Sequence, residues 1–225
     1  MKVGIHQPNY VPWCGYFTKI AYCDLFIFLD DAEISPGQSY VYRSMLRDQN
    51  KTFWLSEPST RHQNQKIMDV TFSNPHWAQS HLARLSQTYC KAPFFKQIMN
   101  LISPIYSDTG KLLAPFNIRL TRTICEYLDI KTKTVLSSEL LPEGTSDERL
   151  ISLVSRVNGT TYVSGKGGQN YQDPEKFEKA RLGLEIKTYQ PIPYTQIHGE
   201  FIGGLSILDC LFNLGRDARS ILQYQ

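Results

Sequence analysis

The stretch "KVGIHQPNYVPWCGYFTKIAYCDLFIFLDD", residues 2–31, decides the fold. Residues 2–6 are apolar and β-prone, and they predict a strand. The two prolines that follow exclude a helix interior, because proline lacks an amide donor and clashes with the preceding turn. Residues 13–23 then carry apolar side chains at helical spacing, and residues 25–29 form a uniformly apolar run. The stretch therefore predicts a strand, a loop, a helix and a second strand buried on both faces.

This opening is typical of a parallel βαβ unit, and the rest of the chain continues the alternation. Residues 37–50 are predicted to form a loop. Further strands are predicted at 53–55, 68–72, 133–136, 160–163 and 184–188, and helices at 76–106 with a break near 92–93, 115–128, 147–157 and 206–213. We predict an α/β fold with a Rossmann-like, mainly parallel sheet. Residues 1–225 are expected to form a single domain, with a helical insertion or subdomain at about 76–130.

The composition excludes several classes of protein. The chain has 225 residues, of which 41% are hydrophobic, enough for a sizeable core. Its net charge is +3 with scattered basic residues, which gives no indication of nucleic-acid binding. The start lacks the apolar region of a signal peptide, and no apolar run is long enough to span a bilayer, so we expect a cytoplasmic protein. Five cysteines without a C-x-x-C pair predict free thiols.

His6 is the first candidate catalytic residue. It ends the first predicted strand, and open α/β sheets bind ligands at the carboxyl ends of their strands. Histidine also titrates near neutral pH. A lone histidine is often a core residue bonded to a carbonyl group, and that alternative stays open. Gln7, Asn9 and Tyr10 add hydrogen-bonding groups to the same loop, and we expect them to bind a ligand there.

Asp30 and Asp31 end the second predicted strand, at the edge of the sheet where His6 is expected. One of them is positioned to orient the imidazole, and we count both as catalytic candidates. Adjacent strand residues point to opposite faces, so only one can face the site. The alternative is a solvated strand end in which one aspartate caps a turn. No histidine-rich spacing accompanies the pair, and we predict no metal site.

A glycine-rich segment suggests an anion-binding loop. A predicted strand runs into it, and its exposed amides and one cation suit a phosphate or carboxylate group. The segment matches neither of the common phosphate-binding glycine motifs, and an ordinary glycine-rich turn is the alternative. Arg43 adds a cation able to form a bidentate fork. The ligand-binding candidates of this segment are Ser164, Gly165, Lys166, Gly167, Gly168 and Tyr171.

Cys14 lies eight residues after His6, which allows a Cys–His nucleophile. A cysteine at the start of an apolar helix is more often a small buried side chain. The thiol therefore ranks below the histidine loop as a site of chemistry.

Six motifs, in order, resemble the WbqC-like family: "HQPNYVPWCGYF", "FLDD", "YCKAPFF", "SGKGGQNYQD", "PYTQ" and "LSILDCLFNLG". Their order and spacing agree from about residue 2 to residue 215. The resemblance implies a protein of surface-polysaccharide assembly of the O-antigen or lipopolysaccharide type. Three positions depart from the family pattern, which has Gln at Glu33 and Asn at Tyr42 and Ser44 beside Arg43. These departures bear on which ligand this protein binds near Arg43.

The leading hypothesis is a transferase that modifies a nucleotide-linked sugar or transfers an acyl or aminoacyl group. His6 would act as general base. The expected partners are a small-molecule substrate and other glycan-assembly enzymes, and the sequence does not identify a cofactor. The alternatives are a non-catalytic ligand- or protein-binding module of the same pathway and a Cys–His hydrolase or acyltransferase.

Overall fold

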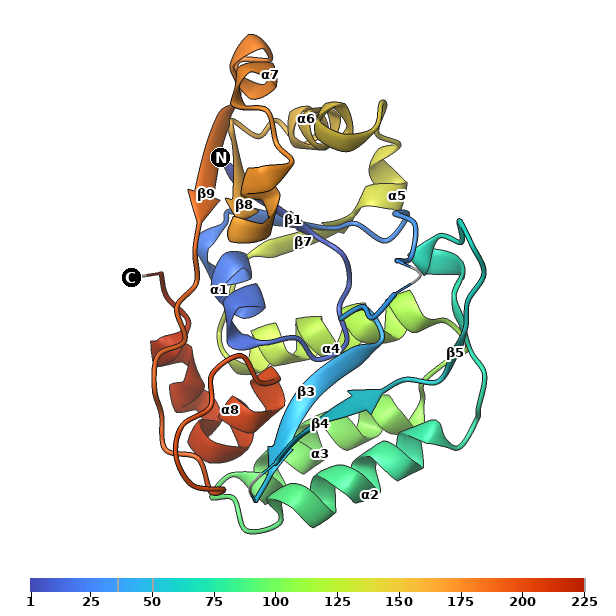
Figure 1. Cartoon of the computed structure of the whole chain (residues 1–225), viewed down its shortest axis with the longest axis vertical. Coiled ribbons are helices and arrows are strands. Elements are labelled where there is room, and N and C mark those ends of the chain that lie inside the picture. Colours follow the sequence, from blue (N-terminus) through green and yellow to red (C-terminus); the bar gives the residue numbers. More distant parts are fainter. Residues whose placement is uncertain (36, 50, 225) are drawn as a thin grey trace.

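A five-stranded parallel sheet forms the centre of the molecule (Figure 1). The computed structural model describes residues 1–35, 37–49 and 51–224, apart from the side chain of Gln169. The order of the strands is β7-β2-β1-β8-β9. Their bounds are β1 Lys2–His6, β2 Leu25–Phe28, β7 Lys133–Leu136, β8 Thr161–Gly165 and β9 Gly183–Lys187. The prediction of an α/β, Rossmann-like fold is confirmed.

The strand order reverses beside β1. The chain runs outward from β1 through β2 to β7, and then crosses to the other side of β1 to form β8 and β9. The connections that leave β1 and β8 therefore diverge at their carboxyl ends. In open α/β sheets, this reversal point leaves a crevice in which ligands bind.

Helices cover both faces of the sheet (Figure 1). Strand residues alternate between the faces: Phe26 and Phe28 join the larger hydrophobic cluster, whereas Ile27 joins the smaller one with Val3 and Ile5. The larger cluster includes α1 Cys14–Tyr22, α2 Trp77–Tyr89, α3 Phe95–Ser107, α4 Leu113–Tyr127, α8 Ile207–Leu214 and η3 Gly215–Ile221. On the other face lie α5 Ser137–Leu140, α6 Ser146–Arg156 and α7 Pro174–Lys179.

The predicted helical middle consists of α2, α3 and α4, and α4 adjoins the sheet, where Arg122 donates to Thr134 Oγ1 of β7 at 2.9 Å. Tyr89 ends α2 and Phe95 begins α3, so the break falls where it was predicted. Helix α4 begins two residues earlier than predicted, because proline is tolerated in a first turn. Ile102 of α3, Ile124 of α4 and Phe28 of β2 share one hydrophobic cluster, which joins the helical layer to the sheet.

Two local predictions were wrong. The predicted loop at 37–50 contains β3 Arg43–Asp48, which pairs antiparallel with β4 Lys51–Ser56. The strand was missed because its buried side includes a polar residue: Arg47 is buried and donates to the Gln196 side chain. The predicted strand at 68–72 is instead η1 Ile67–Asp69 followed by β6 Thr71–Phe72, which pairs with β5 Ser59–Thr60. Positions 36 and 50, near and within the predicted loop, lie outside the described residues.

Candidate functional site

A cavity of about 500 Å³ opens at the carboxyl ends of β1 and β8, where the strand order reverses. The first predicted strand, the helix after it and the glycine-rich segment all contribute to its wall. It is lined by Ile5, His6, Trp13, Gly15, Tyr16, Lys19, Tyr162, Ser164, Gly165, Lys166, Gly167, Gly168, Gln172, Lys187, Thr188, Tyr189 and Tyr224. The fold thus brings His6 and the segment Ser164–Gly168 to one site, although about 160 residues separate them in sequence.

His6 is the last residue of β1 and is half-buried in the cavity wall. Its ring packs edge-on against Tyr16, with ring centroids 4.9 Å apart. The Nδ1 atom lies 3.2 Å from the carbonyl oxygen of Gln7, which can only accept, so Nδ1 carries the proton and Nε2 holds the free lone pair. Burial and the nearby charge of Lys19 lower the pKa of His6 to about 4, so the imidazole is neutral at neutral pH.

Lys19, which lies in α1, was not anticipated as a site residue. Its side chain is 6% exposed, and its ammonium group donates to the carbonyl oxygen of Ile5 at 2.8 Å and faces the ring of Tyr162 at 5.6 Å. Burial lowers the pKa of Lys19 to about 8. Within the described part of the chain, no carboxylate lies within 4.0 Å of this ammonium group. The cavity therefore contains a buried cation that has no ion-pair partner among the described residues.

The sequence held one signal for Lys19. It follows Tyr16 by three positions, which places the two side chains on the same face of a helix. Tyr16 is buried and packs on His6, so Lys19 belongs to the buried face rather than to the solvated one. A lysine in an amphipathic helix ordinarily lies at the surface, and for that reason this position was overlooked.

The glycine-rich segment forms the end of β8 and a tight turn, η2 Lys166–Asn170. A Cβ atom on Gly168 would lie 2.3 Å from Ser164 Oγ and 2.6 Å from Gln172 Nε2, so only glycine allows these groups to approach. A Cβ atom on Gly165 or Gly167 would meet no atom within 4 Å. These two positions leave the backbone open to the cavity, where an anion can reach it.

The cavity wall is positively charged. Lys166 and Lys187 line it together with Lys19, and none of the described residues that line it is acidic. Lys187 forms an ion pair with Glu185 at 3.0 Å, which neutralises part of its charge. Lys19 is the buried cation of the three, and it lies deepest in the protein. The electrostatic field of the wall favours a phosphate or carboxylate group.

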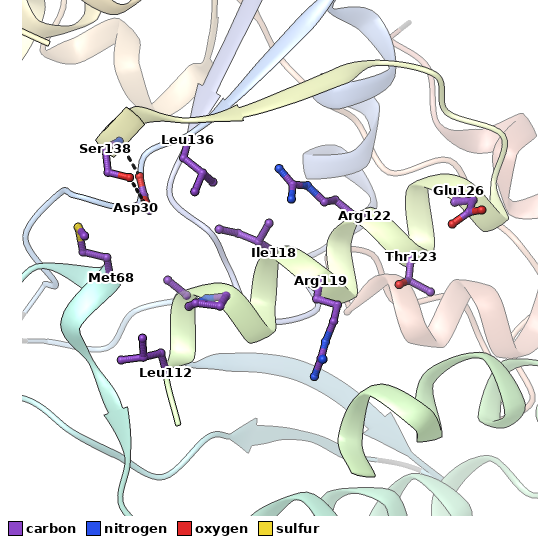
Figure 2. A pocket seen from close by; sticks show the side chains of 12 residues that line it. Asp30, Met68, Leu112, Ile118, Arg119, Arg122, Thr123, Glu126, Leu136 and Ser138 are labelled. Atoms are coloured by element: carbon purple, nitrogen blue, oxygen red, sulfur yellow. Dashed lines mark hydrogen bonds between the residues drawn. The ribbon is translucent and has the colours of Figure 1, made fainter. Parts of the chain in front are cut away.

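Asp30 and Asp31 have partners other than His6, and Figure 2 shows Asp30 beside Ser138. The Asp30 carboxylate accepts from the backbone N–H of Ser138 at 3.0 Å and from its hydroxyl at 2.6 Å. Asp31 pairs with Arg149 at 2.5 Å. The expectation that one of them orients His6 therefore needs correction, since neither makes a hydrogen bond to it. The physical reason is strand order: β2 lies between β1 and β7, and its carboxyl end turns toward β7.

Asp30 instead borders a second cavity, of about 540 Å³, over the exposed side of α4 (Figure 2). Its lining is mainly apolar and includes Met68, Ile118 and Leu136. Arg122 extends along this cavity and donates to Thr134 Oγ1 at 2.9 Å. Asp30 therefore lines a different cavity from His6, although both residues lie at the carboxyl edge of the sheet.

Gln7, Asn9 and Tyr10, the polar residues of the loop after His6, have different roles. The carbonyl group of Gln7 accepts from the Tyr16 hydroxyl at 2.9 Å, and Asn9 is buried. Tyr10 is fully buried, and its hydroxyl group contacts His81 Nδ1 at 2.7 Å and the Tyr106 hydroxyl at 2.5 Å. None of the three lines the cavity, and Tyr10 attaches the loop to the helical layer. The expectation that these three residues bind a ligand in this cavity is therefore not supported by their positions.

The remaining candidates also lie outside the cavity. Arg43 begins β3, stacks on the ring of Trp54 at 3.9 Å and donates to the Gln38 side chain at 2.9 Å. Tyr171 follows η2 and is 81% exposed. Cys14 is buried in the first turn of α1, and no hydrogen bond joins it to His6 in the described structure.

The described residues contain no group of three or more histidine, cysteine, aspartate or glutamate side chains able to hold a metal ion. No helix among them has the length and apolar character needed to cross a membrane.

Comparison with known proteins gives two matches and one negative result. The model of the WbqC-like protein family matches residues 7–221. A protein of Mycobacterium tuberculosis strain H37Rv, whose description is "Uncharacterized protein Rv1507c", is 33% identical over 227 residues. The match covers 99% of this chain and 98% of that protein. No solved structure matches the chain.

Proposed function

The chain belongs to the WbqC-like protein family, and from the geometry of the β1–β8 cavity we propose that it is a transferase with an anionic substrate. The substrate class is a nucleotide-linked sugar or an activated acyl compound, and the process is the assembly of a surface glycan. Nucleotide-linked sugars and coenzyme A thioesters both carry phosphate groups, which suit a basic cavity at the reversal point of a parallel sheet.

The observation that carries the proposal is the buried charge of Lys19, which has no carboxylate within 4.0 Å in the part of the chain that the structure describes. Burying a cation without a countercharge costs several kcal/mol of folding free energy, roughly, even after the protein relaxes. Lys19 keeps only one described hydrogen bond, to Ile5, and its ammonium group has further protons to donate. A phosphate or carboxylate group bound beside it would supply the missing countercharge.

The other residues take roles around that anion. Ser164–Gly168 line the cavity, and in this proposal their backbone amides and the side chain of Lys166 bind the anion. Nε2 of His6 has a free lone pair and is the general base for the acceptor group. An anion beside the imidazole raises its pKa, which makes it a stronger base in the complex than in the free protein.

One observation favours a second function, that of a non-catalytic binding module. Nδ1 of His6 faces a backbone carbonyl group rather than a carboxylate, and the pKa of about 4 makes the free imidazole a weak base. A module of this kind binds the same anion and forms no product.

Calorimetric titration of the wild type, Lys19→Met and Lys91→Met tests the proposal. The ligands are nucleoside-diphosphate sugars, coenzyme A thioesters and inorganic phosphate. Met replaces Lys19 with a flexible apolar side chain of similar length, and Lys91 is an exposed lysine that does not line the cavity. A charge-assisted hydrogen bond contributes about 1.5–3 kcal/mol, so Lys19→Met should weaken binding roughly 10- to 100-fold. Lys91→Met should bind as the wild type does.

Product analysis then separates the two functions. Mass spectrometry of wild type and His6→Gln with the bound donor and candidate acceptors should find transfer only with the wild type. Binding without product in both proteins supports the binding module. If no phosphate-bearing ligand binds the wild type, the proposed substrate class is wrong.

A further inference from the structure

A row of aromatic side chains leads from the cavity to the surface of the β3–β4 hairpin. Trp13 lines the cavity, with its ring centroid 6.0 Å from that of His6. The ring of Tyr40 lies 5.1 Å from Trp13, and the ring of Trp54 lies 5.6 Å from Tyr40. We call Trp13, Tyr40 and Trp54 the aromatic row. Its members come from three separate segments, and tertiary structure alone brings them together.

The outer part of the row is exposed to solvent. Tyr40 is 40% exposed and Trp54 is 41% exposed, although tryptophan and tyrosine side chains are usually mostly buried. Arg43 covers part of Trp54 at 3.9 Å and is held by Gln38. The row is therefore a strip of rings with polar donors along its side, continuous at its inner end with the candidate site.

We propose that the aromatic row is a sugar-binding surface, on which a glycan chain lies with one end in the β1–β8 cavity. The apolar C–H faces of the sugar rings would pack on the side chains of the row, and Arg43 and Gln38 would bind hydroxyl groups. The inference rests on the proposed function, because it makes this glycan the acceptor of the same reaction.

The geometry of the row favours a glycan over other extended ligands. Neighbouring rings are tilted by 59° and 64°, so they do not form one flat stacking platform. The polar side chains beside them, Arg43 and Gln38, offer hydrogen-bond donors of the kind that bind sugar hydroxyl groups. Single-stranded nucleic acid needs a basic groove along its backbone. Arg43 is the cation that stacks on these rings, and none of the other described residues does so.

A purely structural role for Trp54 has a different consequence. Its stacking with Arg43 supports a two-stranded hairpin, so Trp54→Ala can lower stability without touching a binding surface. Trp54→Phe keeps an aromatic face at the same position. Tyr171→Ala removes an exposed aromatic ring outside the row and is the matched control.

The test is binding of the four proteins to an array of defined oligosaccharides of three to six units, followed by titration of the best ligand. Thermal unfolding first establishes that each variant is folded. The wild type and Tyr171→Ala should bind equally. We expect Trp54→Ala to weaken binding about tenfold, the loss of one aromatic contact, and Trp54→Phe to recover most of it. Affinity for nucleoside-diphosphate sugars should not change in any variant.

The outcomes distinguish this inference from the proposed function. If Lys19→Met weakens binding of the anionic ligand while Trp54→Ala leaves glycan affinity unchanged, the proposal of a sugar-binding surface is wrong and the cavity proposal stands. If glycans bind through Trp54 but no anionic ligand binds the cavity, the surface stands and the proposed reaction fails. If no glycan binds, or if Trp54→Ala lowers the affinity for nucleoside-diphosphate sugars instead, the aromatic row is not a glycan-binding surface.

Discussion

At the scale of single residues, the energetics of Lys19 can be measured through its titration. Burial lowers the pKa of Lys19 from the usual 10.5 to about 8. The unfolded chain therefore holds this proton more tightly than the folded one. By linkage, the free energy of unfolding gains a contribution that rises with pH between about 8 and 10.5. Below that window, the buried charge is a cost to the folded protein.

We expect Lys19→Met to be more stable than the wild type at pH 7 and the difference to shrink toward pH 10. One pKa unit corresponds to about 1.36 kcal/mol, so the difference at pH 7 should be no more than roughly 3 kcal/mol. Urea denaturation of both proteins at pH 7, 8.5 and 10 measures it. Titration of tyrosines and cysteines is common to both proteins and cancels. A difference that stays constant with pH would contradict the assignment of an unpaired buried charge.

The same residue sets the pH dependence of binding. Lys19 loses its proton as the pH rises through about 8 in the free protein. Affinity for a phosphate-bearing ligand should therefore fall above that pH in the wild type. Lys19→Met should bind weakly at every pH and show a smaller decline. Titration calorimetry at pH 6.5 and 9 separates the two proteins, and parallel declines would assign the effect to another group.

At the scale of elements, the turn after β8 offers a paired comparison between glycines. A methyl group on Gly168 collides with Ser164 Oγ and Gln172 Nε2, whereas one on Gly165 meets no atom within 4 Å. We expect Gly168→Ala to lower the free energy of unfolding by roughly 1–3 kcal/mol, as overpacking does. Gly165→Ala should stay within about 0.5 kcal/mol of the wild type.

Ligand binding completes this comparison. Gly165→Ala adds its methyl group to open space at the cavity wall, so it should reduce affinity for the anionic ligand while the fold is unchanged. Gly37→Ala, which also meets no atom within 4 Å but lies outside the cavity, is the control. Urea denaturation and calorimetry on the same preparations give both quantities. Normal binding by Gly165→Ala would show that the ligand does not approach this backbone.

The composition of individual strands also explains which parts of the fold could be predicted from the sequence. The apolar run at Leu25–Phe28 predicted a strand because a parallel strand buried on both faces reads as a continuous apolar segment. The hairpin strand Arg43–Asp48 was hidden because Arg47 is buried through hydrogen bonds to distant residues. No local pattern could show those partners.

At the scale of the whole molecule, Tyr10 ties the loop after β1 to the helical layer. Its buried hydroxyl group contacts His81 of α2 and Tyr106 of α3. Tyr10→Phe leaves these partners without it, and we expect a loss of about 1–3 kcal/mol in the free energy of unfolding. Tyr171→Phe, at an exposed position, should lose nothing measurable. Urea denaturation measures both, and a loss below about 0.5 kcal/mol for Tyr10→Phe would contradict this role.

Strand order determined how much of the candidate site could be predicted. His6 and Ser164–Gly168 were each expected at carboxyl ends of strands, and the order β1-β8 makes them neighbours. Asp30 was expected at the same edge, but β2 faces β7, and its carboxylate binds Ser138 instead. A single sequence predicts that a strand exists more readily than which strand lies beside it.

The unpaired charge of Lys19 has a consequence for the life of the protein in a cell. A ligand that binds only the folded state stabilises it by about 2.7 kcal/mol at 100 times its dissociation constant. Proteolysis of the unfolded state then slows, because fewer molecules unfold. If the cavity binds the proposed anion, the amount of this protein should therefore follow the supply of that anion and fall when it is scarce. In Lys19→Met, abundance should lose this dependence.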